Sequence, residues 1–206
     1  MAEQNELPSF PLKTKSIEMI AEGKALKMLP RAKVWKTEDG KVIKEMQFPT
    51  TFVGLAQTKA DYEYFSKRLG DSVAKSYFVV GEGSNGKPTN LIIQTEIKGR
   101  ALRDVPDEEL KSNQELRDNL IKFFSGCLTM WDEDSRMPDI YGRFANPRAT
   151  TNIRIEDATN KPYLTDIIAS ERYFSKNSPL PYRVINQKVI ANTRSFIKNL
   201  NRQVTY

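Results

Sequence analysis

The sequence predicts an α+β protein in which a β-rich first half with one helix precedes a mainly helical second half. Two alternating runs flank Asp39-Gly40, which is a strong signal for a β-hairpin. Gly99 ends the β-rich half, and an apolar stripe with helical spacing follows within residues 106–132. A chain of 206 residues is long enough for one large domain or two small lobes.

The first half is expected to alternate short strands with a single helix, since its apolar runs are short and bounded by Gly, Pro and Asp. The expected elements are an extended arm at 1–15, a helix or irregular strand at 16–27, strands at 32–36 and 41–45, a helix at 58–69, and a strand pair at 76–80 and 90–97. The segment GEGSNGKP between the last two strands contains the glycines of a phosphate-binding loop. It does not lead from a strand into a helix, so a hairpin tip is the favoured interpretation.

The second half is expected to consist of helices around one pair of short strands. The helical stripe comprises Leu120, Phe123, Phe124, Cys127, Leu128 and Trp131. A loop at 137–151 precedes strands at 152–155 and 163–167, and the remainder is helical.

Two residue types restrict the chemistry. Cys127 is the only cysteine and the chain has no histidine, which excludes an internal disulfide, a thiolate metal cluster and any His-dependent site. Acid–base work therefore falls to Asp, Glu, Lys or Tyr. No apolar run approaches the roughly 20 residues that span a bilayer, and the first residues lack the layout of a secretory signal. We expect a cytoplasmic protein without a membrane span.

The positive charge is concentrated at the C-terminus. Residues 170–206 contain seven Lys or Arg and one acid, against a net charge of +6 for the whole chain. Such a segment can attract nucleic acid, an acidic membrane or an anionic substrate. The favoured interpretation is a packed helix, and nucleic acid is the less favoured partner. Its apolar side would carry Ile185, Val189, Phe196 and Leu200, and its solvated side Arg183, Arg194, Lys198 and Arg202.

Three polar residues follow or precede short apolar strands in an order that suits phosphoryl transfer. Lys44 follows Val42-Ile43, Asn152 precedes an alternating run, and Asp166 follows a second short run. A lysine can neutralise nucleotide phosphates, and Mg²⁺ prefers carboxylate and amide oxygens. Lys44 could equally be a surface lysine and Asn152 a turn cap.

These segments resemble the protein-kinase-like superfamily, nearest the aminoglycoside and choline phosphotransferase type. Val42-Ile43-Lys44 resembles the phosphate-binding strand, and Glu63 resembles the helix glutamate that pairs with its lysine, although Asp61 competes for that role. Residues 91–99 resemble the hinge strand. The resemblance implies a two-lobe kinase-like fold, with a nucleotide-binding lobe at 1–97 and a reduced helical lobe with a basic C-terminal helix at 98–206.

The resemblance also implies the ligands and roles of the site. ATP and Mg²⁺ would be the cofactors, with the metal held by Asn152 and Asp166. Lys44, oriented by Glu63, would hold the phosphates, and the adenine would meet backbone groups of the hinge residues Gln94, Glu96 and Ile97. The expected function is an ATP-dependent phosphotransferase acting on a hydroxyl of a small molecule.

Several departures from the family pattern favour a second function, a catalytically degenerate pseudokinase that serves as a binding or regulatory module with a protein partner. The position of the catalytic base in the family, five residues before Asn152, is occupied here by Pro147, which cannot act as a base. The nearest upstream aspartate is Asp139, which is either the base or an ordinary turn residue. The metal motif is Asp166-Ile167-Ile168 without Phe-Gly, and residues 29–32 replace a glycine-rich loop.

Overall fold

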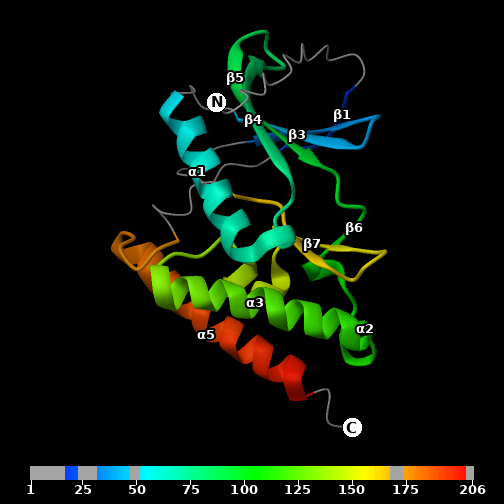
Figure 1. Ribbon diagram of the computed structural model, residues 1–206, viewed down its shortest axis with the longest axis vertical. Coiled ribbons are helices and arrows are strands. Elements are labelled where there is room, and N and C mark those ends of the chain that lie inside the picture. Colours follow the sequence, from blue (N-terminus) through cyan, green and yellow to red (C-terminus); the bar gives the residue numbers. More distant parts are fainter. Residues whose placement is uncertain (1–16, 23–31, 47–51, 168–173, 203–206) are drawn as a thin grey trace, which may run out of the picture. The chain divides into compact units, whose positions relative to one another are not determined.

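The computed structural model describes residues 17–22, 32–46, 52–167 and 174–202 (Figure 1). These residues form two compact units. The first unit comprises the described part of Met1–Lys59 together with Lys75–Glu96, and the second comprises Ala60–Ala74 and the described part of Ile97–Tyr206. The chain is thus of the α+β class, with an antiparallel sheet in its N-terminal part and helices predominating in its C-terminal part. No helix in the described residues is long and apolar enough to cross a bilayer.

The first unit is built on a five-stranded antiparallel sheet with the order β1-β2-β3-β5-β4. Its strands are β1 (Ile17–Glu22), β2 (Ala32–Thr37), β3 (Lys41–Met46), β4 (Ser76–Glu82) and β5 (Pro88–Thr95). The predicted hairpin at Asp39-Gly40 is confirmed: Gly40 has φ +75° and donates its N–H to the Thr37 carbonyl at 3.1 Å. This conformation costs glycine little, which is why the turn forms there.

Strand β5, which lies between β3 and β4, is buried on both of its faces. Leu91 and Ile93 pack with Ile43 on one face, whereas Ile92 and Gln94 are buried on the other. The Gln94 side chain satisfies its burial by donating to the Ser76 hydroxyl at 2.9 Å. A strand covered on both sides reads as a continuous apolar run, as residues 91–93 do.

Glu45 anchors the tip of the β4–β5 hairpin. Its buried carboxylate accepts from the Trp35 Nε1–H at 3.0 Å and from the Ser84 backbone N–H at 2.8 Å. A Cβ on Gly83 would lie 2.6 Å from the Glu45 Oε1, so the tip needs glycine to approach this carboxylate. The segment GEGSNGKP is therefore a hairpin tip, as favoured from its sequence context.

The helix α1 (Phe52–Leu69) begins six residues before the predicted start and ends where predicted, before Gly70 at φ +57°. Its residues up to Lys59 belong to the first unit, and those from Ala60 onward belong to the second. The short 3₁₀ helix η2 (Gly70–Ser72) follows.

The second unit combines a small sheet with two long helices. Strands β6 (Gly99–Ala101), β7 (Ile153–Glu156) and β8 (Pro162–Leu164) form an antiparallel sheet in that order. Helices α2 (Asp107–Ser112) and α3 (Gln114–Asp134) follow β6 and the 3₁₀ helix η3 (Leu102–Asp104), and α5 (Leu180–Arg202) packs against α3. Gly99 thus ends the β-rich half and also begins the second sheet, as the first residue of β6. Glycine is needed at this position because a Cβ there would collide with the Ile155 carbonyl of β7.

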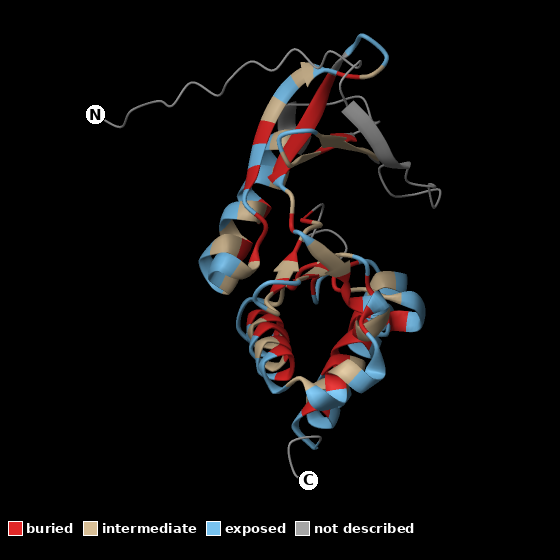
Figure 2. Cartoon of the chain, turned by 90° about the vertical axis from the view of Figure 1, so that its right-hand side faces the viewer, coloured by how far each residue is buried: buried red, intermediate tan, exposed pale blue. Residues whose placement is uncertain are grey.

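The predicted stripe of α3 forms its buried side (Figure 2). Leu128 is the exception, being half-buried. The side chain of Asn113 caps the helix by accepting the Leu116 N–H at 3.0 Å. The Phe124 ring contacts Phe196 of α5 edge-on, with centroids 5.5 Å apart.

The prediction for the C-terminal helix is partly wrong. Val189 and Leu200 are buried as expected, but Ile185 is 41% exposed. Asn186 and Thr193 are buried instead. The Asn186 Nδ2 donates to the Ser175 carbonyl, and the Thr193 hydroxyl donates to the Val189 carbonyl. Apolar periodicity cannot reveal buried polar residues of this kind.

A buried ion pair fastens α1 to the end of α3 within the second unit. Asp61 is fully buried and accepts from Arg136 at 2.7 Å. The same guanidinium lies over the Tyr64 ring, 4.3 Å from its centroid, and the Tyr64 hydroxyl donates to Asp134 at 2.6 Å. Asp61 therefore has a structural role, which removes it as the competitor of Glu63.

We expect Asp61→Ala to lower the free energy of unfolding of the second unit by about 3 kcal/mol, because it leaves the Arg136 charge without its carboxylate. Urea denaturation followed by circular dichroism measures the change. Asp132→Ala is the control: Asp132 pairs with Arg194 with both side chains 57% exposed, so its loss should cost less than about 1 kcal/mol. Equal effects of the two substitutions would contradict the assignment.

The Tyr64 hydroxyl makes stability depend on alkaline pH. Burial, and then the hydrogen bond to Asp134, raises the pKa of Tyr64 to about 12 from 10.0. The folded chain retains this proton where the unfolded chain has lost it, so the contribution is complete below about pH 10 and is lost as the pH rises towards about 12. The stability difference between wild type and Tyr64→Phe should shrink across this interval in urea titrations. A constant difference would show that Tyr64 does not titrate this way.

Candidate functional site

Asn152 and Asp166 lie near the open end of the β7–β8 hairpin. Ile153 pairs with Leu164, and the Thr165 backbone N–H donates to the Asn152 carbonyl at 2.8 Å. The Thr165 hydroxyl donates to the same carbonyl at 3.1 Å. The strand predicted at 163–167 is shorter in the structure, where β8 covers Pro162–Leu164. Asp166 therefore lies just after the strand rather than within it. The hairpin therefore brings the backbone beside Asp166 against Asn152, across a gap of fourteen positions in the sequence.

Asp139 joins the same cluster through Asn152. The Asn152 Nδ2 donates to the Asp139 carbonyl at 3.1 Å. The Asp139 Oδ1 accepts the Tyr141 backbone N–H at 3.0 Å, which fixes the direction of the carboxylate. Since an amide donates through nitrogen and accepts through oxygen, this arrangement leaves the Asn152 Oδ1 as the atom suited to a metal ion.

The loop between Asp139 and Asn152 returns on itself through two short helices, η4 (Arg143–Ala145) and η5 (Pro147–Ala149). A Cβ on Gly142 would lie 2.0 Å from the Asn146 carbonyl oxygen, so only glycine permits this closure. Phe144 and Ala145 adopt φ of 59° and 61°. This compact loop explains how a single hydrogen bond can join Asp139 and Asn152, which lie thirteen positions apart in the sequence.

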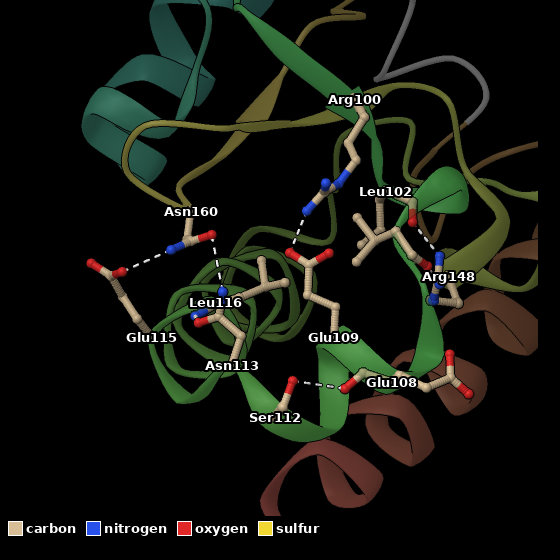
Figure 3. A network of polar contacts seen from close by, with 11 residues as sticks. Arg100, Leu102, Glu108, Glu109, Ser112, Asn113, Glu115, Leu116, Arg148 and Asn160 are labelled. Atoms are coloured by element: carbon tan, nitrogen blue, oxygen red, sulfur yellow. Dashed lines mark hydrogen bonds and ion pairs between the residues drawn. The ribbon is translucent and has the colours of Figure 1, made fainter.

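Contacts from three directions hold the loop in place. Arg148 donates to the carbonyls of Leu102 and Val105 (Figure 3). Asn192 of α5 donates to the Ala145 carbonyl at 2.9 Å, and the Thr150 carbonyl accepts the Arg103 N–H at 3.3 Å. Loops positioned so firmly by a scaffold are where functional residues concentrate.

Arg148 has a structural role in this loop that the sequence did not predict. Its side chain is only 18% exposed and is committed to backbone carbonyls. The local signal is Asn146-Pro147, in which the Asn146 side chain accepts the Arg148 N–H at 3.0 Å and starts η5. Pro147, at the position expected for a base, is buried as the first residue of η5.

Tyr141, two residues after Asp139, is shielded from solvent. Burial raises the pKa of Tyr141, and the charge of Asp139 raises it further, so this phenol stays protonated. Its ring packs edge-on against Phe174, with centroids 4.8 Å apart. Ile167, after Asp166, is 2% exposed, while Ile168 lies outside the described residues.

Lys44 lies in the first unit, on β3, between Val34 of β2 and Ile92 of β5. Strand alternation puts its side chain on the face opposite Ile43 and Glu45. Glu63 is an exposed residue of α1 in the second unit. The pairing of Lys44 with Glu63, and the convergence of Lys44 with Asn152 and Asp166, stay predictions.

Some backbone and side-chain groups of the predicted hinge residues already form hydrogen bonds or ion pairs within the protein. The Glu96 backbone N–H donates to the Gly40 carbonyl at 3.0 Å, and its carboxylate pairs with Lys36 at 2.6 Å. The Ile97 carbonyl accepts from Arg154 Nε at 3.3 Å. The Gln94 side chain is held by Ser76. Residues 29–31, where a phosphate loop was sought, lie outside the described residues.

No protein-family model matches the sequence, and no curated protein matches it significantly. The functional argument therefore depends on the geometry and chemistry of the residues themselves.

We expect Asn152→Ala to lower the free energy of unfolding by about 1–2 kcal/mol, because the Asp139 carbonyl loses its donor. Thr151→Ala, at the exposed neighbouring position, should change it by less than about 0.5 kcal/mol. Urea denaturation compares the two variants. If Asn152→Ala were as stable as wild type, the contact would not hold the loop.

Proposed function

We propose that this protein is a small kinase-like, ATP-binding phosphotransferase that acts on a hydroxyl group of a small molecule. The observation that supports the proposal is the hydrogen-bonded cluster of Asp139, Asn152 and Thr165, with Asp166 next along the chain. A carboxylate for a proton and a carboxylate plus an amide for a metal are the groups that phosphoryl transfer requires.

Magnesium would be held by the Asn152 Oδ1 and the Asp166 carboxylate. Mg²⁺ binds through one or two protein oxygens and completes its octahedron with phosphate oxygens and water. The metal would neutralise the charge that develops on the transferred phosphoryl group.

Lys44 would hold the nucleotide phosphates from its strand, with Glu63 orienting the ammonium, in a two-lobe arrangement of the units. The adenine would meet backbone groups of the Gln94–Ile97 segment. The Glu96 N–H and the Ile97 carbonyl already have partners, so the Glu96 carbonyl and the Ile97 N–H are the groups that suit this contact.

Asp139 would act as the base. The substrate hydroxyl oxygen would attack the γ-phosphorus and give its proton to Asp139, while the bond to the β–γ bridging oxygen breaks and ADP leaves with the electron pair. The hydrogen bond from the Tyr141 backbone N–H to the Asp139 Oδ1 would orient this carboxylate towards the substrate.

The proposal is tested by thermal unfolding with and without Mg-ATP. At one hundred times its dissociation constant, a nucleotide adds about 2.7 kcal/mol of stability. Lys44→Met should abolish the shift, because the phosphates lose their cation. Lys41→Met is the matched control: it lies on the same strand, three positions away and therefore on the opposite face, and should keep the shift. No stabilisation of the wild type at millimolar Mg-ATP would refute the proposal.

The alternative function, a pseudokinase that binds a protein partner, is favoured by Pro147 at the expected base position. ATP hydrolysis or transfer distinguishes the two. An active enzyme should lose turnover in Asp139→Asn with retained nucleotide binding, whereas binding without turnover in the wild type would support the pseudokinase.

A further inference from the structure

A pocket of about 470 Å³ opens in the second unit between α2, η5 and the C-terminal half of α5. This volume lies within the roughly 300–1,000 Å³ typical of small-ligand sites. None of the residues considered above as nucleotide or metal ligands lines it.

Helix α5 contributes both polar and apolar residues to the lining of the pocket. Asn192, Ser195 and Asn199 recur at spacings of three and four residues and so share one side of the helix. Phe196 and Leu200 supply the apolar part of the α5 lining, referred to below as the floor. The Phe196 ring is held edge-on by Phe124 of α3, so the floor offers a ring in a fixed orientation.

The residues that face α5 across the pocket include two cations and one carboxylate. Arg148 directs its guanidinium to the carbonyls of Leu102 and Val105, and its Nη2 lies 3.5 Å from the Asp107 carboxylate. Lys111, one turn along α2 from Asp107, is the remaining cation of the lining. Because Arg148 is engaged by Asp107 and by backbone carbonyls, Lys111 is the one cation of the described lining that is left to attract an anion.

We propose that this pocket binds a neutral, polyhydroxylated ligand of the monosaccharide class. Each carboxamide offers two donors and one acceptor oxygen, and each sugar hydroxyl is both a donor and an acceptor, so Asn146, Asn192 and Asn199 can meet neighbouring hydroxyls in pairs. The Asn146 and Asn192 side chains are already aligned by hydrogen bonds to the loop. The C–H face of a sugar ring suits the Phe196 floor.

Other ligand classes fit the lining less well. An apolar ligand would leave the amides and charges without partners, which costs free energy for each group. A nucleobase is usually held between two apolar faces, and among the described residues that line this pocket Phe196 is the only aromatic one. A metal ion would find one carboxylate, Asp107, in the same described lining. The proposal does not depend on the nucleotide chemistry argued above.

The full chain labelled with ¹⁵N is titrated with glucose, galactose, mannose and ribose up to tens of millimolar, and separately with inorganic phosphate and adenosine. Two-dimensional NMR follows the side-chain amides of Asn146, Asn192 and Asn199. At least one sugar should shift these resonances, and Asn199→Ala should weaken its binding about tenfold. Asn201→Ala, an exposed asparagine of the same helix outside the lining, should bind as the wild type does.

The proposal is overturned if no sugar shifts these amides, if phosphate or adenosine alone does so, or if Asn199→Ala and Asn201→Ala bind the sugar equally. The spectrum of each variant reports whether it is folded. Ser195→Ala removes a second exposed group of the lining, and it should also weaken sugar binding severalfold.

Discussion

Asn152 hydrogen-bonds to two segments that are distant in the sequence, and the arrangement of the candidate site depends on it. Its side chain donates to the Asp139 carbonyl, and its own carbonyl accepts from the backbone and hydroxyl of Thr165. A polar residue placed between a compact loop and the end of a hairpin can fix both only if each of its groups has a partner. Asn152 meets this condition by donating through its Nδ2 to the loop and accepting through its backbone carbonyl from the end of the hairpin.

The second unit surrounds this loop with contacts that are mostly to the backbone. Arg148 reaches η3, and Asn192 reaches η4 from α5. Asp139 and Asn152 meet where this loop begins and ends. Asn146 and Arg148, in the middle of the loop, line the pocket beside α5. These contacts hold the left-handed residues Phe144 and Ala145 of the loop in place.

Local patterns predicted the secondary structure well. Asp39-Gly40 specified its hairpin, Gly70 ended α1, and the spacing of Leu120, Phe123 and Phe124 placed the buried side of α3. These signals depend on neighbours within a few residues, which is why they can be read without a fold. The positions of Asn152 and Asp166 at one end of a hairpin were also predictable, since two short strands separated by a turn pair with each other.

Only the tertiary structure could decide which polar residues belong to the scaffold. Asp61 and Glu63 are equivalent helix acids in the sequence, yet Asp61 is buried against Arg136 and Glu63 is exposed. Asp139 lies farther from Asn152 in the sequence than the family pattern places its base. The loop that closes at Gly142 nevertheless brings the two residues into hydrogen-bonding contact. The sequence determined the elements through local periodicity and turn chemistry. The partners of its charges and amides were determined by packing between segments far apart in the chain, which no local pattern encodes.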